Sequence, residues 1–320
     1  MAYSRVRIPK FYIDSVLLAR QWGELTEINS RGKFHLNPAK VTEFTMPNSG
    51  RHHTTIDFNG YHWQKSSDHL FLLGHENSSN GISIRSKVEL LENGTLIGED
   101  THMSLVSDTH DGWSKYSVDE SENLGERFTI TFEGSSSQTF LIGDFSLGWS
   151  YEMPHSPDVE LTNIHFNESL KVKRTLGGHD VTNTNYNQQP KWIKAAWQRG
   201  FTNTFDNYNV GQVGRRAWNL SFSLLSDTDI FQNFYTNDLA SEQVLDYGIF
   251  RGIGEGNVKI KDDFISKVFH GTNGFQLPFI FQPDKEVEEY AICRINSKSL
   301  QSNQTSFNTY DISLEITETF

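Results

Sequence analysis

Short runs in which apolar and polar residues alternate recur along the chain. In the closing segment YDISLEITETF the apolar residues share one parity: Tyr310, Ile312, Leu314, Ile316 and Phe320. A period of two is typical of a β-strand with one buried face and one wet face. We therefore expect this segment to close a β-sandwich. Its predicted partner is RRAWNLSFSLL or EYAICRIN, whose alternation matches, and not a strand within residues 59–152.

The same pattern predicts further strands in both halves of the chain. RFTITFEG places Phe128, Ile130 and Phe132 on one face, and several such runs with turn signals between them follow one another from Gly60 to Tyr151. This spacing favours an antiparallel β-sandwich. In the second half, RRAWNLSFSLLSD places four apolar residues on one face: Trp218, Leu220, Phe222 and Leu224.

Helical periodicity is confined to a few segments. KDDFISKVFHGTNG has Asp262 or Asp263 as a capping residue and Gly271 as a stop signal, and TNDLASEQVLDY is a second, weaker candidate. KFYIDSVLL fits a strand or a helix, and its β-branched and aromatic residues favour the strand. The predicted fold class is mainly β with one or two short helices.

Short alternating runs with turn signals between them begin near residue 60, which marks one boundary. The two prolines of SYEMPHSPD mark a second boundary. We therefore divide the chain into residues 1–58, residues 59–152 and residues 153–320. The aromatic content of 13% is too high for a disordered chain.

Charge and cysteine usage exclude several classes of protein. The net charge of −12 disfavours binding to nucleic acid and to anionic membranes. We expect no signal peptide, because charged residues interrupt the apolar ones of the opening segment, and we find no run of about 18 apolar residues. The single cysteine, Cys293, excludes an internal disulfide, and we favour a buried thiol over a reactive one.

Motifs for catalysis or cofactor binding are absent from the sequence. There is no P-loop, nucleophile elbow, H-E-x-x-H or C-x-x-C, so we expect no enzyme activity and no cofactor. Five histidines lie between His52 and His75, but their spacing is irregular, and we favour a surface loop over a metal site. SDTHDG has the acid density of a Ca²⁺ turn, and we favour an ordinary turn before a strand.

Aromatic residues next to glycine or polar residues are candidates for binding sugars. They are Trp63, Trp113, Trp149 and Tyr151. An amphipathic ring can stack on a sugar while it stays wet, so these side chains are a possible glycan platform. The alternative is that Trp113 and Trp149 fill the core of the sandwich.

Several sequence blocks resemble tail structural proteins of tailed bacteriophages, of the marine phage type. The blocks are SYEMPHSPDVELT, RTLGGHDVTNTNY, GRRAWNLSFSLLSDTDIF, LPFIFQPD, EYAICRIN and YDISLEITETF. Their order in the C-terminal half is similar to that of distal tail proteins. The resemblance covers most of residues 151–320 and, more faintly, RIPKFYIDS. The chain departs from the commonest distal tail proteins because its sandwich comes early.

The resemblance implies a β-sandwich or β-barrel tail domain formed by residues 1–58 and 153–320. Residues 59–152 would then be an inserted jelly-roll or galectin-like sandwich. It further implies a structural virion protein of the tail tip or baseplate, assembled in the host cytoplasm. Its partners would be copies of itself in a ring of three or six and other tail proteins. The alternative function is a carbohydrate-binding module that recognises a host surface glycan.

Overall fold

The fold is mainly antiparallel β, as the alternation predicts. A computed structural model describes residues 6–22, 27–28, 42–57, 68–75, 83–92, 95–100, 107–110, 112–117, 127–158, 162–165, 170–184, 216–231 and 263–319. Their helical segments are α1 (Ser15–Trp22), α3 (Asp227–Ile230) and the π-helix η5 (Ile265–His270). Every strand pair among the described residues is antiparallel.

A single 11-stranded sheet runs through most of the molecule. Its strands, in spatial order, are β13 (Thr162–His165), β16 (Arg216–Ser226), β20 (Thr309–Glu318), β18 (Ala291–Ile295), β17 (Phe279–Gln282), β1 (Lys10–Asp14), β12 (Asp144–Glu152), β5 (His69–His75), β9 (Gly112–Ser117) and β8 (Ser107–His110). The strand β19 (Ser302–Ser306) pairs with β20 beside this path.

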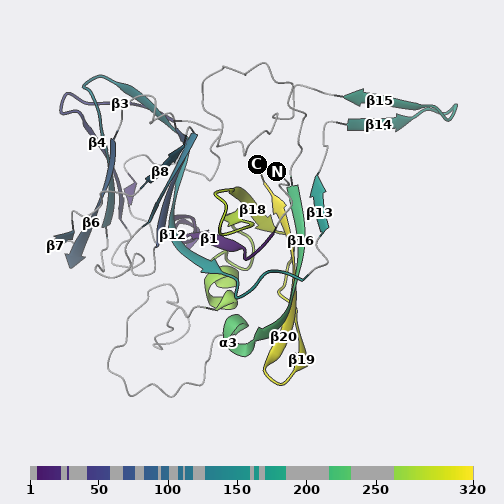
Figure 1. Cartoon of the computed structure of the whole chain (residues 1–320). Helices are drawn as coiled ribbons and strands as arrows, with labels where there is room; N and C mark the ends of the chain where they lie inside the picture. Colours follow the sequence, from purple (N-terminus) through teal and green to yellow (C-terminus); the bar gives the residue numbers. More distant parts are fainter. Residues whose placement is uncertain are drawn as a thin grey trace.

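Smaller sheets complete the fold. The largest has five strands in the order β2 (Glu27–Ile28), β4 (Arg51–Asp57), β10 (Arg127–Glu133), β6 (Ser83–Glu92) and β7 (Thr95–Asp100). Figure 1 shows β4, β6 and β7 at the left, facing the part of the long sheet that holds β12 and β8. Two pairs remain, β3 (Thr42–Thr45) with β11 (Thr139–Ile142) and β14 (Leu170–Arg174) with β15 (Asp180–Thr184).

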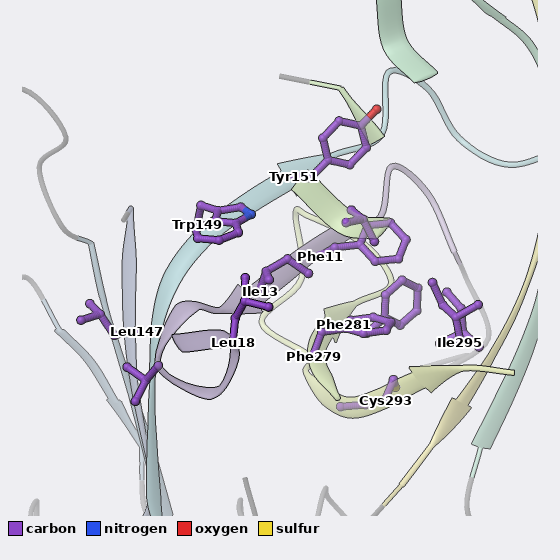
Figure 2. Close-up of a cluster of buried hydrophobic side chains, with 14 of the residues drawn as sticks. Phe11, Ile13, Leu18, Leu147, Trp149, Tyr151, Phe279, Phe281, Cys293 and Ile295 are labelled. Carbon is purple, nitrogen blue, oxygen red and sulfur yellow. The ribbon is translucent and has the colours of Figure 1, made fainter. Parts of the chain in front are cut away.

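The central strands of the long sheet are buried on both faces. In β1, Phe11 and Ile13 belong to the larger hydrophobic core, whereas Tyr12 belongs to a second cluster on the opposite face. Figure 2 shows how the larger core gathers side chains from β1, β12, β17 and β18. Segments such as LFLL and FIF have no polar alternation because both of their faces are covered.

The partners predicted for the closing strand are confirmed. β20 pairs with β16 on one side and with β18 on the other, so both predicted candidates are its neighbours. Its apolar face is buried at Ile312, Leu314 and Ile316. The closing strand thus has a hydrogen-bonded neighbour on each side.

One residue that the sequence assigned to the apolar face of β16 is exposed instead. Trp218, Leu220 and Phe222 are buried, but Leu224 is 75% exposed. The register shifts between Phe222 and Leu225, which is a β-bulge, and Leu225 takes the buried position instead. Leu224 has a φ of +62°, a conformation that L-residues with large side chains rarely adopt.

KFYIDSVLL contains both of the structures that its sequence allows. The strand β1 covers its first five residues, and α1 begins at Ser15. The change from strand to helix occurs at Asp14, because its Oδ1 accepts hydrogen bonds from the amides of Val16 (2.8 Å) and Leu17 (3.0 Å). A carboxylate that accepts the first free amides of a helix acts as its N-cap.

The helix predicted in KDDFISKVFHGTNG is present as η5. Asp263, one residue before the N-cap Phe264, accepts hydrogen bonds from the amide and the hydroxyl of Ser266, both at 2.7 Å. η5 ends at His270, and Gly271 is its C-cap as predicted, in the right-handed helical conformation. The second candidate, TNDLASEQVLDY, lies outside the described residues.

The long sheet is continuous across the two predicted segment boundaries. β1 pairs with β17 on one edge and with β12 on the other, and β12 also pairs with β5. Residues 1–58, 59–152 and 153–320 therefore share one hydrogen-bonded sheet. At Gly148, a Cβ atom would lie 2.0 Å from the carbonyl oxygen of Ile13, so β1 and β12 require glycine there.

Candidate functional site

Three of the four predicted glycan-platform residues lie in the hydrophobic core. Trp149 is 1% exposed and donates a hydrogen bond from Nε1 to the carbonyl of Lys267 at 3.0 Å. The Tyr151 hydroxyl donates to the carbonyl of Asp229 at 3.0 Å. The Trp113 ring packs edge-on against Tyr290, with 5.0 Å between ring centroids.

These positions correct the platform prediction for the three residues. A ring that stacks on a sugar needs one accessible face, and Trp113, Trp149 and Tyr151 have none. The alternative of core packing for Trp113 and Trp149 is the one that the structure shows. Trp63 lies outside the described residues, so none of the predicted platform residues that the structure describes is accessible to a glycan.

The histidine-rich segment forms no metal site where the structure describes it. The described residues contain no group of three or more metal-ligating side chains. His52 and His53 lie on β4, whereas His69 is buried at the start of β5. His62 is outside the described residues.

His69 belongs to a buried polar cluster that sequence reasoning missed. Its Nδ1 lies 2.7 Å from Asp68 Oδ1, and Asp68 Oδ2 accepts hydrogen bonds from the hydroxyl and the amide of Ser150. Burial opposes ionisation of Asp68, but the hydrogen bonds from His69 and Ser150 outweigh it and lower the pKa of Asp68 to about 2. The carboxylate lies between the serine and the histidine, so the imidazole does not contact the hydroxyl as it does in a nucleophilic triad.

A second buried cluster joins β16 to the end of β20. Arg216 Nε lies 3.1 Å from Glu318 Oε2, and the guanidinium also contacts Glu289. Glu318 occupies the buried face of the closing strand, a position that alternation assigns to an apolar residue. Cys293 is nearby, and burial raises the pKa of its thiol, which makes it unreactive.

The most prominent surface feature is the β14–β15 hairpin, called the arm below (residues 170–184). Figure 1 shows the arm extending away from the rest of the molecule at the upper right. Its two strands pair only with each other among the described strands. At its tip Leu176 has a relative exposure of 111%.

Hydrogen bonds hold the tip of the arm in one conformation. The Gly178 amide donates to the Thr175 carbonyl at 2.9 Å, and the Thr175 amide donates to the His179 carbonyl at 2.8 Å. The Thr175 hydroxyl donates to the same carbonyl at 3.0 Å. Gly178 has a φ of +81°, which glycine adopts without strain. The turn therefore presents Leu176 to solvent on a defined backbone.

A second hairpin, β19–β20, also displays an apolar residue. Phe307, at its turn, is 86% exposed, and Figure 1 shows this hairpin at the bottom of the molecule. The arm and this hairpin thus place exposed apolar side chains at two separate ends of the molecule. Both exposed apolar side chains lie at the turn of a hairpin.

Comparison with known proteins identifies no relative of this chain. No protein-family model, no curated protein and no solved structure matches it. The resemblance to phage tail proteins therefore rests on the sequence blocks alone. No helix within the described residues is long and apolar enough to cross a membrane.

Proposed function

We propose that the chain is a structural component of a bacteriophage virion tail, in the tail tip or baseplate ring. It would assemble through contacts with copies of itself and with other tail proteins, in the cytoplasm of the host, and would be located in the virion. The observation that carries the proposal is the arm, which projects from the body and ends in a fully exposed leucine.

The arm supports a role in assembly because a hairpin of two strands gains stability when a partner covers it. An isolated two-stranded hairpin is marginally stable in water, and a partner surface that covers it would stabilise it. An exposed Leu176 costs solubility in a free monomer and gains buried apolar area in a complex. Both properties favour a subunit that works in an assembly.

The positions of the phage-like sequence blocks also support the proposal. RRAWNLSFSLLSD contains β16, LPFIFQPD contains β17, EYAICRIN contains β18 and YDISLEITETF contains most of β20. In the sheet these strands are contiguous, in the order β16, β20, β18, β17. Blocks spread over a hundred residues of sequence thus form one structural unit, as a shared tail domain requires.

Immunogold electron microscopy of purified virions tests the function. We expect an antibody against the purified chain to label the tail end of the particle, and the same antibody absorbed with the chain to label nothing. Labelling that is absent from virions, or confined to host cells, would contradict the proposal. Genes for a tape-measure or tail-tube protein beside this one would give independent support.

A further inference from the structure

The arm is basic, although the chain that carries it is acidic. Residues 170–184 contain Lys171, Lys173 and Arg174 against the single acid Asp180, whereas the whole chain has a net charge of −12. Lys173 and Arg174 are exposed and form no ion pair with any described residue. A basic element on an acidic protein is attracted to the acidic surface of another copy of that protein.

An acidic loop elsewhere on the molecule has the complementary composition. Between β17 and β18, residues 284–289 read DKEVEE, called the acidic loop below. Glu286 and Glu288 are exposed, and Val287 between them is 49% exposed. The loop thus presents an apolar side chain flanked by carboxylates, while the arm presents an apolar side chain next to cations.

Hydrogen bonds to a buried side chain fix the backbone of the acidic loop. The side-chain amide of Gln282, which is buried, donates hydrogen bonds to the carbonyls of Lys285 (3.3 Å) and Val287 (2.9 Å). Its Oε1 accepts a hydrogen bond from the Tyr12 hydroxyl at 2.8 Å. Asp284 Oδ1 accepts from the Glu286 amide at 3.1 Å. A loop fixed in this way loses little conformational entropy when a partner binds.

We propose that the arm of one copy docks on the acidic loop of a second copy. Leu176 would pack against Val287, and Lys173 and Arg174 would face Glu286 and Glu288. The contact is heterologous, because it joins two different patches, so repetition closes a ring when the rotation between copies allows it. The inference rests on the proposed function and names the surfaces that build the predicted ring.

Disulfide trapping between full-length variants tests the apolar half of the contact. Leu176→Cys protein is mixed under mild oxidation with Val287→Cys protein that carries a tag of different size. The native Cys293 is buried and does not compete. We expect a heterodimer on a non-reducing gel, at about ten times the yield obtained with Phe307→Cys in place of Val287→Cys, because docking raises the effective concentration of the two thiols. Equal yields with Val287→Cys and Phe307→Cys would overturn the proposal.

Charge reversal tests the polar half. Analytical ultracentrifugation of the wild type should show self-association that weakens as NaCl is raised. K173E/R174E and E286K/E288K should each weaken association by about tenfold, because like charges then face each other, and the combination of all four changes should restore it. A combined variant that stays as weak as either pair, or a wild type that remains monomeric, would overturn the proposal.

The two proposals fail separately. If gold labels the virion tail but disulfide trapping and charge rescue both fail, the docking mode is disproved and the proposed function is not. If trapping and rescue succeed in solution but the virions are not labelled, the docking mode is supported and the tail function is disproved.

Discussion

At the level of single residues, the chain buries a carboxyl group at the junction of β1 and α1. Burial raises the pKa of Asp14 from its ordinary 3.8 to about 7, against the opposing effect of the two amides that it caps. Between these two pH values the unfolded chain loses the proton while the folded chain keeps it. The folded state therefore loses stability as the pH rises from about 4 through about 7.

Asp14→Asn should remove this pH dependence. Asparagine keeps an oxygen for the amides of Val16 and Leu17 but carries no charge to bury. Relative to the wild type, the variant should gain about 2 to 4 kcal/mol in free energy of unfolding between pH 4 and pH 8. Urea denaturation across this range measures the difference. Asp14→Ala, which also loses the cap, should be less stable than Asp14→Asn by about 1 kcal/mol at every pH and equally insensitive to pH. Parallel profiles of wild type and Asp14→Asn would contradict the assignment.

Gly148 is the second residue with a sharp structural requirement. A Cβ atom there would lie 2.0 Å from the Ile13 carbonyl oxygen and 2.9 Å from the Ser15 amide nitrogen, and both are backbone atoms that cannot rotate away. Gly148→Ala should lower the free energy of unfolding by about 3 kcal/mol or more. The matched control is Gly177→Ala, where a Cβ would meet nothing closer than 3.8 Å. Thermal denaturation compares the two, and similar losses in both variants would argue against this close approach of β1 and β12.

At the level of strands, the buried ion pair of Arg216 and Glu318 joins β16 to β20. Both side chains are largely buried, so removing either one leaves the other without its main charged partner, and Arg216 then keeps only its contact with Glu289. Glu318→Ala should cost about 3 kcal/mol of stability. The double variant Arg216→Met, Glu318→Met should cost less than the sum of the single changes, because neither charge is then left alone.

Glu315→Ala is the control for that experiment. Glu315 lies on the exposed face of the same strand, and its loss should change stability by no more than about 0.5 kcal/mol. Chemical denaturation of the wild type, Arg216→Met, Glu318→Met and the double variant supplies the cycle. Additive losses for Arg216 and Glu318 would mean that the pair contributes no coupling.

Strands and their buried faces were largely predictable from alternation. It located β16, β18 and β20, assigned Ile312, Leu314 and Ile316 to the core, and named two of the three strands that pair with β20. It failed at Leu224, because a β-bulge shifts the parity of the residues that follow. It also failed to anticipate Glu318, since a carboxylate on the apolar face is acceptable only with a partner that lies 102 residues away.

At the level of the whole molecule, the continuous sheet makes a prediction about the segment boundaries. An independent inserted sandwich could be excised without loss of the remaining domain. Here, however, β12 supplies one of the two neighbours of β1, and Phe11, Tyr12 and Ile13 of β1 are fully buried. We therefore expect a chain in which residues 59–152 are replaced by a short glycine-serine linker to lose cooperative unfolding.

Calorimetry of this deletion and of the full chain measures the outcome. The full chain should unfold without a separate transition for residues 59–152, since one sheet and one hydrophobic core span the three segments. A deletion variant that keeps a sharp transition would establish residues 59–152 as an independent insertion, as the phage resemblance implies.

The sequence by itself determined the β class, the parity of the buried faces and the local switch from strand to helix at Asp14. Each depends on neighbouring residues only, because backbone geometry sets the period of two and the capping of the first free amides. The tertiary structure alone decided that Trp113, Trp149 and Tyr151 are core residues, that β1 lies between β17 and β12, and that Leu176 extends into solvent. These depend on whether a distant strand covers a given face, and such contacts, like that between Tyr12 and Gln282, join residues separated by most of the chain. No local pattern contains that information.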